Sequence, residues 1–158
     1  EESSDTPACG MGTGTGGPGM IGRLDELASE ASVSVSGPNI AIDLINAGAV
    51  DLYLSSFDMA WDDSTTNLRH IHHKTPPLWT EAKIWPETGS ANFPSPIIKE
   101  SFYGSLEERL IPGKGYSTLD KLHFTDTFVS GTSVTLTLYF EDASATPLGS
   151  STLSFILN

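Results

Sequence analysis

The chain has 158 residues, of which 20 are acidic, 8 are basic and one is cysteine, and its formal net charge at pH 7 is −12. A single domain of this length buries about 70% of the surface that its unfolded chain exposes, so it needs neither a metal nor a disulfide to fold. The negative charge argues against nucleic acid and anionic membrane surfaces as partners, and the single Cys9 excludes an internal disulfide and a cysteine-based zinc finger.

Residues 1–22 are predicted to be a glycine-rich N-terminal segment, since the stretch CGMGTGTGGPGMIG at 9–22 holds seven of the fifteen glycines. Glycine loses the most backbone entropy on ordering and offers no side chain to bury. By itself the segment is expected to be a flexible linker. Contact with a neighbouring subunit and packing on its own domain are two ways in which it would become ordered. If the protein is exported, residues 1–5 would be a polar start after a removed leader.

The remainder, residues 23–158, is predicted to be a β-sandwich domain. Apolar residues at helical spacing predict one short helix at 23–30, which packing must stabilise. From residue 32 onward the hydrophobic period is two, as in strands. Within residues 50–61 the apolar parity changes at Ser55 and Ser56, which is what a β-bulge produces.

Turn signals separate further short runs, and strands are predicted at 67–73, 78–85, 96–103, 117–125, 132–141 and 151–157. The clearest is 132–141, whose inward side chains are expected to be Val134, Leu136, Leu138 and Phe140. Burying each of them contributes about 1.5–3 kcal/mol before the entropy of ordering is counted. Eight or nine short strands of this kind predict an all-β fold, an antiparallel β-sandwich.

Histidines cluster in the run His70-Ile71-His72-His73. Residues i and i+2 of a strand lie on the same side, so His70 and His72 can chelate a divalent transition metal. A tight site needs a third or fourth ligand, which His123 or a carboxylate from elsewhere must supply. The alternative is an exposed polar edge strand.

Acidic residues gather at one strand end and in the loop that follows it: Asp58, Asp62, Asp63 and Asn67. Their oxygens suit calcium, but the spacing of an EF-hand is absent, and an acidic solvated loop is the alternative. A nucleophile elbow, a phosphate-binding loop and a His-Glu-x-x-His motif are also absent. The sequence therefore predicts a protein that is not an enzyme and that carries no cofactor.

Tryptophans mark the run 78–85, in which Trp79, Glu81, Lys83 and Trp85 share one parity and Leu78, Thr80, Ala82 and Ile84 share the other. If the aliphatic set is buried, Trp79 and Trp85 are exposed and suit sugar stacking or a protein contact. The opposite assignment buries both tryptophans.

The segments INAGAVDLYLSSFDMAWDD, NLRHI, AKIWPETG, ERLIPGKGYSTLDKLHF and TSVTLTLYFEDAS occur in this order over about residues 39–157. In that order they resemble the globular ectodomains of prokaryotic type IV pilin-like proteins. The resemblance implies a secreted β-sandwich that assembles into a surface filament. Pilins carry a long apolar N-terminal helix, which residues 1–31 lack, so the helix would be removed or lie on a separate anchoring subunit. The N-terminal segment could otherwise complete a neighbour's sheet.

From the sequence we predict a structural, non-catalytic subunit of an extracellular filament or cell-surface assembly. Its main partner would be another copy of itself. The alternative is a secreted binding module that recognises carbohydrate through Trp79 and Trp85 or a divalent metal through His70 and His72.

Overall fold

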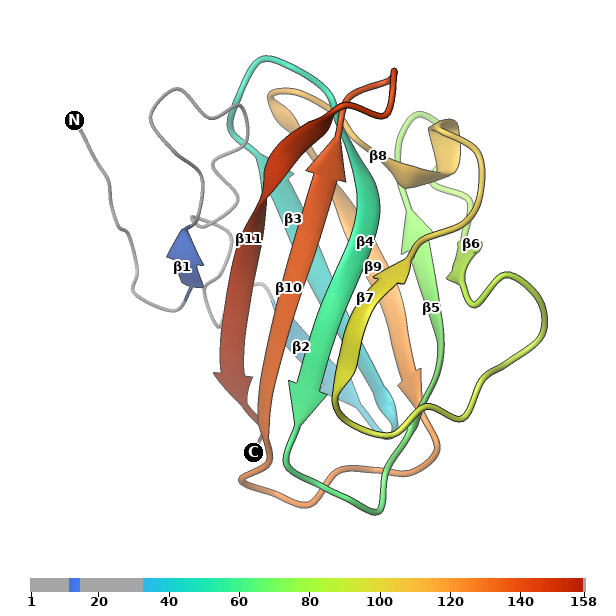
Figure 1. Cartoon of the computed structure of the whole chain (residues 1–158), viewed down its shortest axis with the longest axis vertical. Coiled ribbons are helices and arrows are strands. Elements are labelled where there is room, and N and C mark those ends of the chain that lie inside the picture. Colours follow the sequence, from blue (N-terminus) through green and yellow to red (C-terminus); the bar gives the residue numbers. More distant parts are fainter. Residues whose placement is uncertain (1–11, 15–32, 158) are drawn as a thin grey trace.

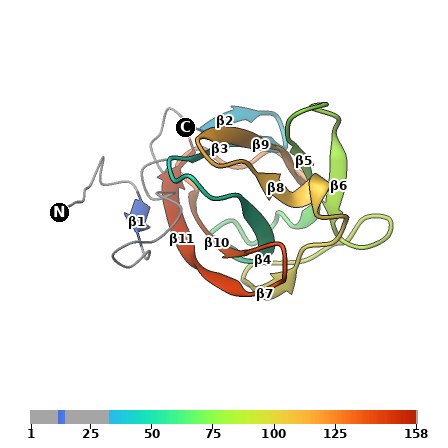
Figure 2. The same cartoon turned by 90° about the horizontal axis from the view of Figure 1, so that it is seen from above.

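The computed structural model describes residues 12–14 and 33–157, and the helix expected at 23–30 lies outside these residues. The described chain forms an all-β sandwich of two antiparallel sheets that enclose one core (Figures 1 and 2). Helix is limited in these residues to one 3-10 turn, Glu107–Arg109. The prediction of an all-β antiparallel sandwich is therefore confirmed.

The first sheet contains six strands in the order β1-β11-β10-β4-β7, and β8 pairs with the N-terminal end of β4. Their bounds are β1 Gly12–Gly14, β4 Leu52–Trp61, β7 Ile97–Ser101, β8 Leu110–Ile111, β10 Ser133–Glu141 and β11 Pro147–Ile156. β1 comes from the glycine-rich segment and lies at one edge of this sheet.

The second sheet contains five strands in the order β2-β3-β9-β5-β6. Their bounds are β2 Val33–Ser36, β3 Asn39–Asn46, β5 Leu68–Lys74, β6 Ala82–Trp85 and β9 Gly115–Phe124. Both sheets mix strands from distant parts of the sequence, so neither is a simple meander. This pairing brings the histidines of β5 next to the one on β9.

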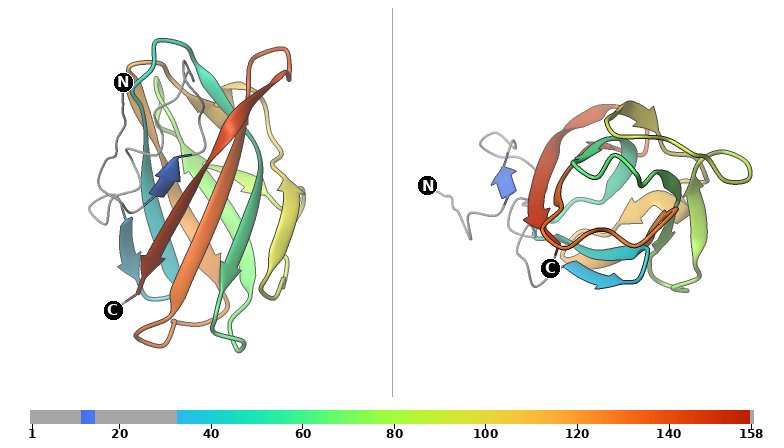
Figure 3. Two further views of the ribbon diagram at one scale, coloured as in Figure 1. Left: turned by 60° about the vertical axis from the view of Figure 1, so that its left-hand side comes forward. Right: turned by 90° about the horizontal axis from the view of Figure 1, so that it is seen from below.

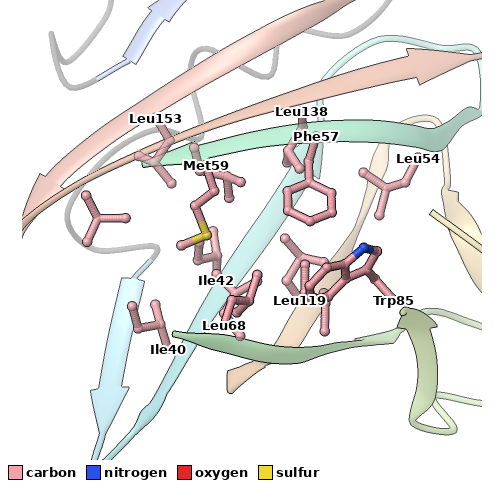
Figure 4. Packing of buried hydrophobic residues seen from close by; sticks show 14 of the residues in the cluster. Ile40, Ile42, Leu54, Phe57, Met59, Leu68, Trp85, Leu119, Leu138 and Leu153 are labelled. Atoms are coloured by element: carbon pink, nitrogen blue, oxygen red, sulfur yellow. The ribbon is translucent and has the colours of Figure 1, made fainter. Parts of the chain in front are cut away.

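The core lies between the sheets and is built from the alternate side chains that period two predicts (Figure 4). On β10 the buried residues are Val134, Leu136, Leu138 and Phe140, as expected. Aromatic rings fill the centre: Phe57 stacks on Phe102 with ring centroids 4.9 Å apart and meets the edge of Trp85 at 5.5 Å. Offset and edge contacts of this kind add to the stability that the buried area provides.

The β-bulge predicted at Ser55 and Ser56 is present in β4. Tyr139 of β10 pairs with Ser56, but the next residue, Phe140, pairs with Leu54, so Ser55 is an extra residue in the ladder. One extra residue exchanges the faces of a strand. This is why Leu54 and Phe57 are both buried although their numbers differ in parity.

The strand predicted at 78–85 is shorter than expected and does not alternate. Only Ala82–Trp85 form β6, and the ladder with β5 shifts register between Ile71 and His72. As a result Ile84 and Trp85 are both buried, whereas Leu78 is 82% exposed. Residues 75–79 form a turn instead, in which the Trp79 N–H donates to the Thr75 carbonyl at 3.0 Å.

Candidate functional sites

The outer edge of β11 is the first candidate site, because it accepts a strand from the N-terminal segment (Figure 3). β1 pairs antiparallel with it, with Thr13 opposite Thr152. β10 covers the other side of β11 along nearly its whole length, from Ser133 opposite Ile156 to Glu141 opposite Pro147. On the outer side, within the described part of the chain, strand pairing is limited to Ser151–Leu153. A sheet edge with unpaired amides and carbonyls is a template for another strand.

Three histidines form a row on the outer face of the second sheet. His70 lies between His72 and His123, with ring centroids 4.7 Å from each. The structure thus brings both predicted metal ligands together and adds the third histidine that the sequence suggested. The Nδ1 atoms of His72 and His123 are engaged, by Glu81 Oε2 at 2.6 Å and by Asn39 Oδ1 at 2.5 Å.

The His70 and His123 rings are stacked, and the His72 ring is tilted by 34° against His70. His70 and His123 are only 16° from parallel, and because imidazole lone pairs lie in the ring planes, two face-to-face rings do not direct them at one ion between the rings. Among residues 12–14 and 33–157, no group of three or more histidine, cysteine, aspartate or glutamate side chains is placed to hold a metal ion. Burial, followed by the neighbouring His72 and His123, lowers the pKa of His70 to about 4.

We expect the histidine row to bind nickel, copper or zinc weakly, with a dissociation constant above about 1 μM. Binding requires the stacked rings of His70 and His123 to rotate so that their nitrogens point at a common ion. Isothermal calorimetry with the native chain and with the His70→Ala/His72→Ala variant measures this. Submicromolar affinity that the double variant loses would contradict the expectation.

His73 is a buried histidine whose role the sequence did not predict. Its imidazole is 0% exposed, with Nδ1 donating to the Glu108 carbonyl at 2.7 Å and Nε2 accepting from the Ser117 hydroxyl at 2.8 Å. Burial lowers its pKa to about 4. The sequence did contain a hint of this burial: His73 is two residues after Ile71, so both side chains lie on the inward face of β5.

The acidic residues considered for calcium are used as loop acceptors. Asp63 accepts from the Thr65 hydroxyl at 2.6 Å and from the Thr66 hydroxyl at 3.3 Å, and its bonds to Thr65 are the main cause of its lowered pKa. Asp58 accepts from the Tyr139 hydroxyl at 2.6 Å, on the outer face of the first sheet. These carboxylates therefore stabilise the protein's own loops and strands.

The two tryptophans predicted to share a surface are separated. Trp85 is 1% exposed, and its indole N–H donates to Glu100 Oε1 at 3.0 Å, so its prediction as a surface or ligand-stacking residue is wrong. The register shift in β6 is the reason, since it turns residue 85 toward the core. Trp79 lies in the turn before β6 and is 36% exposed.

Comparisons of this chain with protein-family models, with curated protein sequences and with solved structures find no match. In the described residues no helix is long and apolar enough to cross a membrane.

Proposed function

We propose that the protein is a structural, non-catalytic subunit of an extracellular filament or cell-surface assembly, in which the N-terminal segment of one copy pairs with the β11 edge of the next. The observation that carries this proposal is the pairing of Gly12–Gly14 with Ser151–Leu153. This pairing supports strand addition. Gly12–Gly14 has almost no side chains to bury, and yet its backbone pairs with the outer edge of β11. Backbone pairing supplies affinity that does not depend on side chains.

The length of chain between β1 and β2 makes an exchange between copies possible. The 18 residues numbered 15–32 separate them, and such a segment can span up to about 60 Å. That is larger than a domain of this size, so β1 can reach the β11 edge of an adjacent molecule. When each copy donates to the next without closing a ring, a filament results.

The other parts of the proposal come from the sequence. The resemblance to pilin-like ectodomains favours a surface filament, and a separate subunit would anchor it. The strongly acidic surface suits a protein that works in contact with solvent. The main rival is the secreted binding module. The stacked histidines do not favour metal binding by such a module. For carbohydrate binding, Trp85 is buried and only Trp79 of the two predicted tryptophans is exposed.

Cysteine pairs across the β1–β11 ladder test the exchange directly. We expect a mixture of two single variants, Thr13→Cys and Thr152→Cys, each also carrying Cys9→Ser, to form a covalent heterodimer under mild oxidation. Directly opposite residues in an antiparallel pair have Cβ atoms about 4.5–5.5 Å apart, close to the separation that a disulfide needs. Denaturing electrophoresis measures the product.

The double variant Thr13→Cys/Thr152→Cys in the same Cys9→Ser background is the matched control. A ladder of covalent multimers supports exchange, whereas a crosslinked monomer shows that β1 stays on its own domain. Deleting residues 1–22 is expected to abolish multimers in light scattering and electron microscopy while the domain remains folded. An intact chain that is monomeric at high concentration, with no heterodimer, would overturn the proposal.

A further inference from the structure

An exposed aromatic pair lies at one end of the outer face of the second sheet. The ring of Trp79, from the turn before β6, lies 5.0 Å from the ring of Tyr116 on β9, at an angle of 43°. Tyr116 is 48% exposed, and across the strands it pairs with Ile45 of β3, which is 46% exposed. Segments far apart in the sequence thus form one aromatic platform, which we define as Trp79 and Tyr116.

The backbone of Trp79 adopts a conformation that bulky residues rarely take. Its φ is 56°, in the left-handed region that favours glycine. The N–H bond to the Thr75 carbonyl holds it there. A strained residue persists when the surrounding structure fixes it, and such residues concentrate at functional sites. In this turn the strained position presents an indole ring at the surface.

The polar ends of both rings are the next feature of the platform. Within the described residues, neither the Trp79 indole N–H nor the Tyr116 hydroxyl has a hydrogen-bond partner. Thr118 lies on β9 two residues after Tyr116. It pairs with Asp43 of β3 on one side and with Lys74 of β5 on the other. The Thr118 hydroxyl donates to Asp43 Oδ1 at 2.9 Å.

The row next to the platform therefore carries a hydroxyl, a carboxylate and an ammonium group. Lys74 also lies 3.7 Å from Asp120 Oδ1, so its charge is held near the sheet surface. The row can exchange hydrogen bonds with a ligand that rests on the rings. Flat rings beside a few placed polar groups form the kind of surface that orients a small polar ligand.

We infer that this platform binds a neutral saccharide. The negative faces of the aromatic rings attract the slightly positive C–H groups on one side of a sugar ring. The sugar hydroxyls then bond to the Trp79 indole N–H and the Tyr116 hydroxyl. Thr118, Asp43 and Lys74 offer further partners. The net charge of −12 disfavours an anionic sugar.

A protein partner fits this surface less well. A specific protein interface buries about 800 Å² on each side, whereas the platform offers two rings with the exposed Leu78 and Ile45 beside them, and polar and charged groups follow at Thr118, Asp43 and Lys74. This inference does not depend on strand exchange, since the platform lies on the second sheet and β11 belongs to the first.

Binding can be followed through tryptophan fluorescence. Of the three tryptophans, Trp61 and Trp85 are 5% and 1% exposed, so acrylamide quenching reports mainly on Trp79. We expect that one of cellohexaose, chitohexaose, maltohexaose or xylohexaose protects Trp79 from acrylamide and binds in calorimetry. The experiment uses the full chain at a concentration where it is monomeric.

The decisive variant is Trp79→Gly, because glycine suits the left-handed backbone and the domain should stay folded. It is expected to weaken binding by about tenfold or more, and Tyr116→Ala should weaken it as well. Tyr103→Ala, which removes a surface ring of 38% exposure elsewhere, is the control and should leave affinity unchanged. Affinity that Trp79→Gly does not change, or no binding of any of the four sugars at millimolar concentration, would overturn the inference. A change in sedimentation of the sugar-free protein on Trp79→Gly would do so too, since it would identify the platform as a protein contact.

Discussion

Replacing Leu136 by alanine is expected to lower the free energy of unfolding by about 2–5 kcal/mol. Leu136 lies in the middle of β10, between β4 and β11, and is 1% exposed. It points between the two sheets, so truncation removes buried apolar area and leaves a cavity that the paired strands on both sides cannot collapse to fill. Urea unfolding followed by fluorescence measures the loss.

Thr137, the next residue on β10, is the matched control. Its hydroxyl lies on the outer face and shares a hydrogen bond of 2.9 Å with the Thr152 hydroxyl. Thr137→Ala should cost about 1 kcal/mol or less, because a partly exposed hydrogen bond contributes little net stability. Equal losses at Leu136 and Thr137 would mean that both faces of β10 are buried, as in the centre of an assembly.

Acid is expected to destabilise the domain between about pH 6.5 and pH 4 through His73. Its pKa in the folded protein is about 4, whereas the ordinary pKa of a histidine is 6.5. Between these values the unfolded chain binds a proton that the folded protein does not, so stability falls as the pH falls. The contribution is complete above pH 6.5, and about 3 kcal/mol of it is lost by pH 4. His70, whose pKa is lowered in the same direction, adds to the effect.

Unfolding in urea at a series of pH values from 7.5 to 4 tests this prediction. His73→Asn keeps a donor for the Glu108 carbonyl and removes the titrating ring, so the difference in stability between pH 7 and pH 4 should shrink by about 3 kcal/mol. Ser117→Ala is the control: it removes the partner of Nε2 and lowers stability, but it keeps the imidazole and its pH dependence. An unchanged pH dependence in His73→Asn would place the acid sensitivity elsewhere, for example in His70 or His123, whose pKa values burial also lowers.

The strands that sequence reasoning predicted well are those with strict alternation and clear turns. β10 is the best example, because four apolar residues at period two leave only one face that can be buried. The bulge in β4 was also readable, since one inserted residue changes the parity within a single apolar run. In both cases the order of apolar and polar residues within one strand is enough to predict which side chains face the core.

The candidate sites depended on pairing between distant segments, and there the sequence was less informative. His70 and His72 share a side by their spacing, but only the ladder of β5 with β9 places His123 beside them as a stacked ring. Tyr116 lies one residue before the strand predicted at 117–125, so nothing in its neighbourhood linked it to Trp79.

By itself, the sequence determined the all-β class, the inward face of β10 and the glycine-rich character of the N-terminal segment. Only the tertiary structure decided that Trp85 is buried while Trp79 is exposed, because a register shift against β5 turns residue 85 inward. It also decided which strand edge receives β1. Both outcomes depend on how strands from distant parts of the chain pair, and a pattern of period two specifies the faces of each strand but not its neighbours.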